Sequence, residues 1–177
     1  MPFSALGLAP SLAHAAASQG LIAPTPVQSQ AIPAILNGHD LRACAPTGSG
    51  KTAAYVLPLL QQWLLSDAAQ RQGSRSTQAL VLVPTRELAA QVAELIYHVG
   101  EAMGRRPKVA VLTGGVSINP QLMALRGGAD MVIATPGRLL DVVAHSQLKL
   151  HTIDTLVMDE ADRRLDRGVA VEREHVL

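Results

Sequence analysis

Aromatic residues are scarce in this chain, with one Trp, two Tyr and one Phe among 177 residues, or 2% of the sequence. The core must therefore be built from Ala, Leu and Val, and stacking platforms for nucleic-acid bases are largely excluded. The hydrophobic fraction is nevertheless 48%, which is typical of a globular chain and excludes a disordered one. The length suits one domain with a sizeable core.

Cysteine is rare, and long apolar runs and excess charge are missing. The single cysteine, Cys44, cannot form an internal disulfide, which fits a reducing cytoplasm, and we expect it to be a small buried hydrophobe in a strand. No apolar run approaches the roughly 20 residues of a membrane span, and no signal peptide is predicted. The formal net charge of +1 argues neither for nor against nucleic acid, so any such contact must come from a local patch.

Short apolar runs alternate with helical patterns along the chain. The predicted strands cover residues 41–45, 79–83, 109–112, 131–134 and 155–158, and the predicted helices cover residues 11–19, 27–36, 51–65, 86–103, 118–125 and 137–144. This alternation predicts an α/β fold, a three-layer sandwich with a mostly parallel sheet and right-handed crossovers. Residues 66–78 are predicted to be a surface loop, in which Arg71 and Arg75 either contact RNA or are simply solvated.

A polar cluster directly follows each predicted strand. The clusters are residues 46–52, 84–87, 113–115, 135–138 and 159–162. In a parallel sheet, ligands bind beyond the carboxyl ends of the strands. We therefore expect all five clusters to line one rim of the sheet.

The first cluster has the character of a phosphate-binding loop. Residues 45–52 read APTGSGKT, which matches G-x-x-x-x-G-K-[ST] except at the first position. Glycines let backbone N–H groups curl around an anion, and the next helix directs its positive dipole end at the same place. Lys51 is expected near the β- and γ-phosphates and Thr52 on Mg²⁺, although a chance Gly/Ser turn is the alternative. The expected nucleotide contacts here are Thr47, Gly48, Ser49, Gly50, Lys51 and Thr52.

The last cluster places carboxylates directly after an apolar strand. Asp159 is expected to hold Mg²⁺ through water, because Mg²⁺ keeps several of its waters. Glu160 is expected near the γ-phosphate, where it would orient or deprotonate the attacking water. The alternative is an acidic loop that caps a helix.

Residues 159–162 spell Asp-Glu-Ala-Asp, and with them the whole chain resembles the DEAD-box ATP-dependent RNA helicases. Residues 20–28 resemble the family's glutamine motif, which implies that Gln28 reads the adenine edge of ATP and that the upstream aromatic, Phe3, stacks on the ring. The resemblance implies an N-terminal, RecA-like P-loop NTPase lobe over residues 1–177. Adenine recognition would lie in residues 1–37 and a partial RecA-like core in residues 38–177.

Three other motifs resemble the family's RNA-contacting segments: PTRELA at residues 84–89, TGG at 113–115 and TPGR at 135–138. Exposed backbone N–H groups and arginines can grip a sugar–phosphate backbone without reading bases. For Arg86, a structural salt bridge to Glu87 or Glu94 is the alternative. The expected RNA contacts are Pro84, Thr85, Arg86, Gly114, Gly115, Thr135, Gly137 and Arg138.

The sequence departs from the family beyond the acidic motif. Family members have a second RecA-like lobe, which supplies an arginine to the transferring phosphoryl group, and this lobe is missing here together with the Ser-Ala-Thr motif. Val169 stands where the family usually has Phe, and Asp162 is expected to couple to the missing parts. The strand before Ser-Ala-Thr would separate the phosphate-loop strand from the acidic-motif strand. We therefore expect those two strands to face a gap.

The resemblance implies the ATP-binding lobe of an RNA helicase that couples ATP binding and hydrolysis to RNA clamping and local duplex unwinding. Its partners would be ATP, Mg²⁺, RNA and the second lobe, and no membrane. The alternative for the chain alone is a truncated nucleotide- and RNA-binding module without independent turnover. A DNA helicase or another P-loop ATPase is a third reading, and the glutamine motif and the Ala-Asp ending of the acidic motif argue against it.

Overall fold

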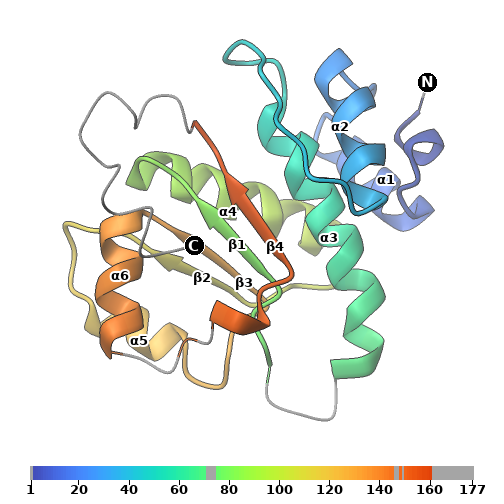
Figure 1. The fold of residues 1–177 in the computed structure, drawn as a ribbon. Helices are drawn as coiled ribbons and strands as arrows, with labels where there is room; N and C mark the ends of the chain where they lie inside the picture. Colours follow the sequence, from blue (N-terminus) through green and yellow to red (C-terminus); the bar gives the residue numbers. More distant parts are fainter. Residues whose placement is uncertain (1, 71–74, 146–147, 149, 161–177) are drawn as a thin grey trace. The chain divides into compact units, whose positions relative to one another are not determined.

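A computed structural model describes residues 2–70, 75–145, 148 and 150–160 (Figure 1). The chain divides into two compact units, which are described separately. The helical unit comprises residues 1–71 and 94–107, and the sheet unit comprises residues 72–93 and 108–177. Three residues named above, Arg71, Asp162 and Val169, lie outside the described residues.

The helical unit contains η1 (Phe3–Leu6), α1 (Pro10–Ser18), α2 (Pro26–Leu36), α3 (Lys51–Gln70) and the last part of α4 (Arg86–Ala102). Proline begins α1 and α2, where its missing N–H would have had no partner within the helix. Packing of α2 against α3 forms much of this core. Its fully buried side chains include Leu12, Ile32, Leu57 and Leu60.

The strand predicted at residues 41–45 is wrong. This segment is neither helix nor strand, Leu41 is 47% exposed, and Cys44 is exposed although we expected it to be buried. A strand forms only where a neighbour accepts its backbone hydrogen bonds, and the described part of the helical unit contains no strand. The predicted loop also starts too early, because α3 continues through Ala68 and Ala69, which favour helix, to Gln70.

The sheet unit is built on four parallel strands in the order β2-β3-β1-β4. They are β1 (Ala79–Leu82), β2 (Val109–Leu112), β3 (Met131–Ala134) and β4 (Thr155–Met158), each within one residue of its prediction. The unit also holds α5 (Asn119–Ala124), α6 (Pro136–His145) and η2 (Leu150–Thr152). The predicted parallel sheet is therefore confirmed for these four strands.

The crossovers determine which helix covers which face of this sheet. The connection from β1 to β2 runs one way along the strand order, whereas those from β2 to β3 and from β3 to β4 run the other way. Because such crossovers are right-handed, the first turns of α4 lie on one face and α5 and α6 on the other (Figure 1). Flanking helices on both faces agree with the predicted layered α/β fold.

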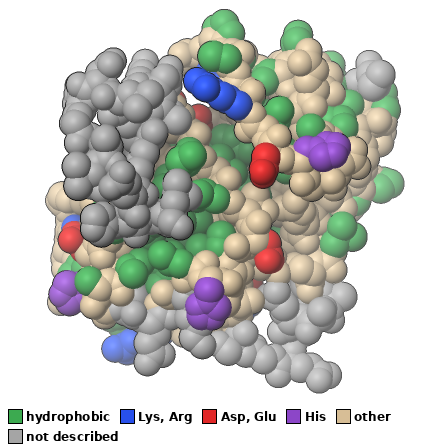
Figure 2. Space-filling model, in the orientation of Figure 1, with side chains coloured by type: hydrophobic (Ala, Val, Ile, Leu, Met, Phe, Trp, Pro, Cys, Tyr) green, Lys and Arg blue, Asp and Glu red, His purple; other side chains and the backbone are tan. Residues whose placement is uncertain are grey.

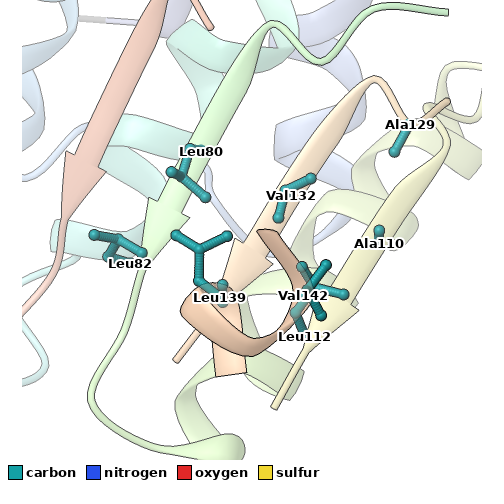
Figure 3. Close-up of a cluster of buried hydrophobic side chains, with 9 residues drawn as sticks. Leu80, Leu82, Ala110, Leu112, Ala129, Val132, Leu139 and Val142 are labelled. Carbon is teal, nitrogen blue, oxygen red and sulfur yellow. The ribbon is translucent and has the colours of Figure 1, made fainter. Parts of the chain in front are cut away.

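Aliphatic side chains fill the space between the sheet and α6. Figure 3 shows alternate residues of β1, β2 and β3 directed toward the buried face of α6. Every second residue of a strand points to the same face, which explains why each four-residue strand contributes two. This cluster consists of Leu80, Leu82, Ala110, Leu112, Ala129, Val132, Ala134, Leu139 and Val142.

The outer strand β4 pairs only with β1 in the described part of the sheet. Its register places Leu156 beside Leu80 and Met158 beside Leu82, yet these two β4 side chains are 37% and 46% exposed. Figure 2 shows apolar side chains at the surface in this region. Among the described residues, β4 is therefore an edge strand, and the gap expected between it and a phosphate-loop strand stays a prediction.

Asp130 ties the starts of two strands together and gives the first prediction. Its side chain is 7% exposed, accepts a hydrogen bond from the Lys108 backbone N at 2.6 Å, and lies 3.6 Å from Arg75 Nε. Replacing Asp130 with Ala should lower the free energy of unfolding by about 1–3 kcal/mol in urea melts, because the Lys108 N–H loses its acceptor. The exposed Asp154 is the matched control, and Asp154→Ala should change stability by less than about 0.5 kcal/mol. Equal losses for the two variants would contradict this role.

Candidate functional site

All four strands of the sheet unit end at one level. Leu82 is in register with Ala134 and Met158, and Ala134 is in register with Leu112. The next backbone N–H groups continue this pairing, because those of Val83, Thr135 and Asp159 donate to Ala134, Leu112 and Leu82, each at 2.9 Å. Four of the five predicted polar clusters therefore start at the same edge of the sheet. The fifth, residues 46–52, belongs to the helical unit.

The acidic pair at the end of β4 has an unusual backbone. Asp159 is 9% exposed, and its Oδ1 accepts a hydrogen bond from the Glu160 N–H at 2.9 Å. Glu160 has φ +50, and no other non-glycine residue in the described ranges has a positive φ. Such a conformation costs on the order of 1–3 kcal/mol and tends to persist at functional sites. This geometry supports a functional role for the pair, although the separate roles of Asp159 and Glu160 stay predictions.

The loop before α3 has the geometry of an anion cradle. Gly48 and Gly50 have φ of +79 and +90, which L side chains rarely adopt. Between them, Ser49 Oγ is buried and makes no hydrogen bond within the described residues. A buried hydroxyl without a partner at the N-terminus of a helix can donate to a phosphate oxygen, which fits as its missing acceptor. The residues present therefore fit the predicted triphosphate.

Lys51 folds back over this loop. Its Nζ donates hydrogen bonds to the carbonyl oxygens of Ala45 and of Pro46, the latter at 3.1 Å. The ammonium group is thus held against the loop that precedes it. An incoming phosphate would replace these neutral carbonyls with charged oxygens, which form the stronger hydrogen bonds.

The glutamine motif is joined to the cradle through a side chain. Gln28 is 1% exposed, its Oε1 accepts from the Thr25 N–H at 2.9 Å, and its Nε2 donates to the Gly50 carbonyl at 3.0 Å. Thr25 Oγ1 accepts in turn from the Gln28 N–H, which completes a capping box at the start of α2. Our sequence reasoning missed this connection, although the pattern T-x-x-Q is a sequence sign of a capping box. Phe3 is 3% exposed in the core of this unit, so adenine binding by Phe3 and Gln28 stays a prediction.

The first predicted RNA motif lies at the start of α4. Thr85 Oγ1 accepts from the Leu88 N–H at 3.1 Å and so caps the helix. Arg86 is exposed and forms no ion pair in the described part of the chain, which argues against the alternative of a structural salt bridge. A Cβ added to Gly115 would lie 3.2 Å from Arg86 Nη1, so this guanidinium lies against Gly115 in the loop that follows β2. The structure thus brings Arg86 and Gly115 together.

Arg138 is placed differently from Arg86. Its side chain is only 10% exposed, its Nη2 donates to the Val116 carbonyl at 2.8 Å, and its Nε lies 3.7 Å from Asp141 Oδ2. The Nε and Nη1 atoms are buried and make no hydrogen bond among the described residues. Within the sheet unit, Arg138 therefore supports the glycine-containing loop after β2. Thr135 is half-buried and Gly137 is exposed.

Neither a metal-binding cluster nor a membrane-spanning helix is present among the described residues. No three His, Cys, Asp or Glu side chains converge in a way that would hold a metal ion in the ranges that the structure covers. Within the same ranges, no helix has the length and apolar character that crossing a membrane requires. The described residues therefore offer no all-protein metal cage.

Comparison with known proteins gives one consistent family. The family model described as DEAD/DEAH box helicase matches residues 25–177. The DEAD-box ATP-dependent RNA helicase CshA of Streptococcus pneumoniae is 41% identical over 177 residues, which are 100% of this chain and 32% of that protein. The ATP-dependent RNA helicase SrmB of Escherichia coli is 42% identical over 175 residues, which are 98% of this chain and 38% of that protein.

Solved structures give the same result. The RNA helicase Prp28 from Chaetomium thermophilum, bound to ADP, aligns with a TM-score of 0.83 and 37% identity, over 97% of this chain and 41% of that one. A hypothetical ATP-dependent RNA helicase from Sulfolobus tokodaii aligns with a TM-score of 0.80 and 36% identity, over 94% of this chain and 45% of that one. The chain spans about a third of the length of the curated relatives it matches.

The close approach of Gly50 to Gln28 gives the second prediction. A Cβ at residue 50 would lie 2.3 Å from Gln28 Nε2, whereas a Cβ at residue 48 would meet nothing within 4 Å. Both glycines have a positive φ, so Gly48→Ala controls for backbone strain alone. Gly50→Ala should weaken binding of a fluorescent ADP by at least about tenfold more than Gly48→Ala, because only Gly50→Ala expels the Gln28 carboxamide. Equal weakening in the two variants would show that the Gln28 contact does not matter.

Proposed function

Because the chain belongs to the DEAD/DEAH box helicase family and corresponds to the N-terminal RecA-like lobe of its members, we propose that it is the ATP-binding lobe of an ATP-dependent RNA helicase. The observation that carries this proposal is the loop before α3, where two glycines with positive φ flank the unpartnered buried Ser49 hydroxyl. ATP binding and hydrolysis in the whole protein would drive RNA clamping and local duplex unwinding. The exposed single cysteine, Cys44, supports a reducing compartment such as the cytoplasm.

A few residues would bind and hydrolyse the nucleotide, each with a separate role. The backbone of residues 47–50 and the ammonium of Lys51 bind the phosphates, and Gln28 with Phe3 binds the adenine. Thr52 and Asp159 hold Mg²⁺, which when bound would neutralise charge on the phosphate oxygens. Glu160 orients the attacking water or accepts its proton. The orphaned Ser49 hydroxyl and the positive φ of Glu160 support these assignments.

The RNA half uses the edge of the sheet unit. Arg86 supplies charge, and exposed backbone around Gly114, Gly115 and Gly137 supplies N–H donors, while Pro84, Thr85, Thr135 and Arg138 shape the surface. Such donors meet phosphates and sugar hydroxyls and carry no base specificity. The preference for RNA rests on the names of the relatives. A second RecA-like lobe is the partner that would complete the catalytic site.

Removing the Lys51 ammonium gives the third prediction. Lys51→Ala should weaken binding of fluorescent ADP by about 10–100-fold, because a charge-assisted hydrogen bond to phosphate is lost. The control is Arg42→Ala, which removes the same charge from an exposed position upstream of the loop and should leave affinity within about twofold.

The same pair of variants tests catalysis. Phosphate release is measured with and without RNA for the wild type and both variants. RNA-stimulated release in the wild type and in Arg42→Ala that vanishes in Lys51→Ala would support turnover by this chain alone. Unchanged nucleotide affinity in Lys51→Ala would remove the basis of the proposed function. Nucleotide binding without any turnover would favour the binding-module alternative for this chain.

Arg86 gives the fourth prediction. Arg86→Ala should weaken binding of a fluorescein-labelled oligouridylate and reduce the slope of log K against log salt by roughly 0.7–0.9, because one phosphate contact is lost. Arg126→Ala removes an exposed arginine outside the predicted RNA motifs of the same unit and should leave both affinity and slope near the wild-type values. If the two variants had the same slope, Arg86 would not contact phosphate.

A further inference from the structure

Gln121 is a buried polar side chain to which neither the sequence motifs nor the proposed function gives a role. It lies in α5, is 8% exposed, and bonds only to backbone atoms. Its Oε1 accepts from the Thr113 N–H at 3.0 Å. Its Nε2 donates to the carbonyl of Thr113 at 3.0 Å and to that of Ser117 at 3.3 Å. One carboxamide thus closes the loop of residues 113–117, called here the glycine loop.

The position of Thr113 explains why this carboxamide matters. Thr113 directly follows β2, whose last residue, Leu112, still pairs with β3. Thr113 is 9% exposed, so its own N–H and carbonyl would be costly without partners. A glutamine side chain offers one acceptor and two donors, and here it takes the place of a peptide group from a neighbouring strand.

The middle of the glycine loop, unlike Thr113, is exposed and has backbone N–H groups without partners among the described residues. The backbone N–H groups of Gly114 and Gly115 make no hydrogen bond within the described residues, and Gly115, Val116 and Ser117 are exposed. The backbone shape is nevertheless fixed on both sides of these amides, by Gln121 at the two ends and by Arg138 at the Val116 carbonyl. Because the N–H donors of Gly114 and Gly115 are already held in place, a ligand can bind them without the entropic cost of ordering the loop.

We propose that Gln121 is a positioning residue for RNA binding. Its carboxamide holds the glycine loop in the shape in which the Gly114 and Gly115 amides meet a backbone phosphate. Gln121 itself does not contact RNA. This inference rests on the proposed function, because RNA supplies the phosphate.

The test compares two buried carboxamides of the same chain. Gln121→Met keeps the length of the side chain and removes all three hydrogen bonds. The matched control is Gln61→Met, because Gln61 is 7% exposed, accepts from the Ala9 N–H at 2.7 Å, and lies in the helical unit outside the predicted RNA motifs. Three quantities are measured for each variant: affinity for the labelled oligouridylate, affinity for fluorescent ADP, and the NMR resonances of the Gly114 and Gly115 amides.

Gln121→Met should weaken oligouridylate binding by about tenfold and shift or broaden both glycine amide resonances, with ADP affinity within about twofold of the wild type. Its salt slope should not change, because no charge is lost. Gln61→Met should change neither the RNA affinity nor the two resonances. Gln121→Leu, which also removes all three hydrogen bonds and adds no charge, serves as the second variant if Gln121→Met does not fold. It should give the same result as Gln121→Met.

Two results separate this inference from the proposed function. If Arg86→Ala weakens RNA binding but Gln121→Met does not, or if the two glycine resonances are unchanged in Gln121→Met, the positioning role of Gln121 is wrong and the proposed function stands. If the wild type and Arg86→Ala bind the oligouridylate equally poorly, the proposed RNA function is wrong. The proposed role of Gln121 in RNA binding is then wrong as well, and the two glycine resonances report only whether Gln121 fixes the shape of the loop.

Discussion

The register of the parallel sheet is the constraint on which the sheet unit depends. All four strands stop at the level of Leu82, so the polar segments that follow them are forced to begin at one edge. No attraction between these segments is needed to bring them together. This explains how Arg86, which follows β1, and Gly115, which follows β2, come into contact although β3 separates their strands. The buried aliphatic cluster over α6 fixes that register, because a slip of one residue would turn every apolar side chain to the wrong face.

Beyond the ends of the strands, where backbone pairing stops, glutamine carboxamides fix the conformation of the loops. Gln28 joins the start of α2 to the phosphate loop, and Gln121 joins the end of β2 to the start of α5. Each is nearly fully buried and bonds to backbone on both sides of its amide. A buried amide with all its bonds made adds rigidity, whereas one left unpaired would be costly. Gln121 therefore positions the backbone near the proposed RNA without touching it, whereas Gln28 would both hold the phosphate loop and bind the adenine.

Much of the fold could be predicted from the sequence because apolar periodicity and strand-end polarity are local properties. The four strands of the sheet and the starts of α2, α3 and α4 lie within one residue of their predictions. The strand at 41–45 was predicted wrongly because apolar residues favour a strand but do not show whether a neighbouring strand is available to pair with it. Arg138 shows the same limit for the site, since its sequence motif suggests an exposed phosphate ligand and only the fold reveals its bond to Val116. Gln121 had no local sign at all, because its partners are eight and four residues away across a turn.

The arrangement of charge explains why loop shape carries so much weight in the proposed RNA surface. The whole chain has a formal charge of only +1, and of the two arginines in the predicted RNA motifs, Arg138 is largely buried beside Asp141. Arg86 remains as the exposed cation of these motifs. Binding that relied on counterion release would need many such cations, since each contributes one phosphate contact. The uncharged amides must then supply most of the affinity of this lobe, and amides do so only when their geometry is fixed in advance. For such a surface, residues that hold the backbone in place matter as much as the groups that meet the phosphate.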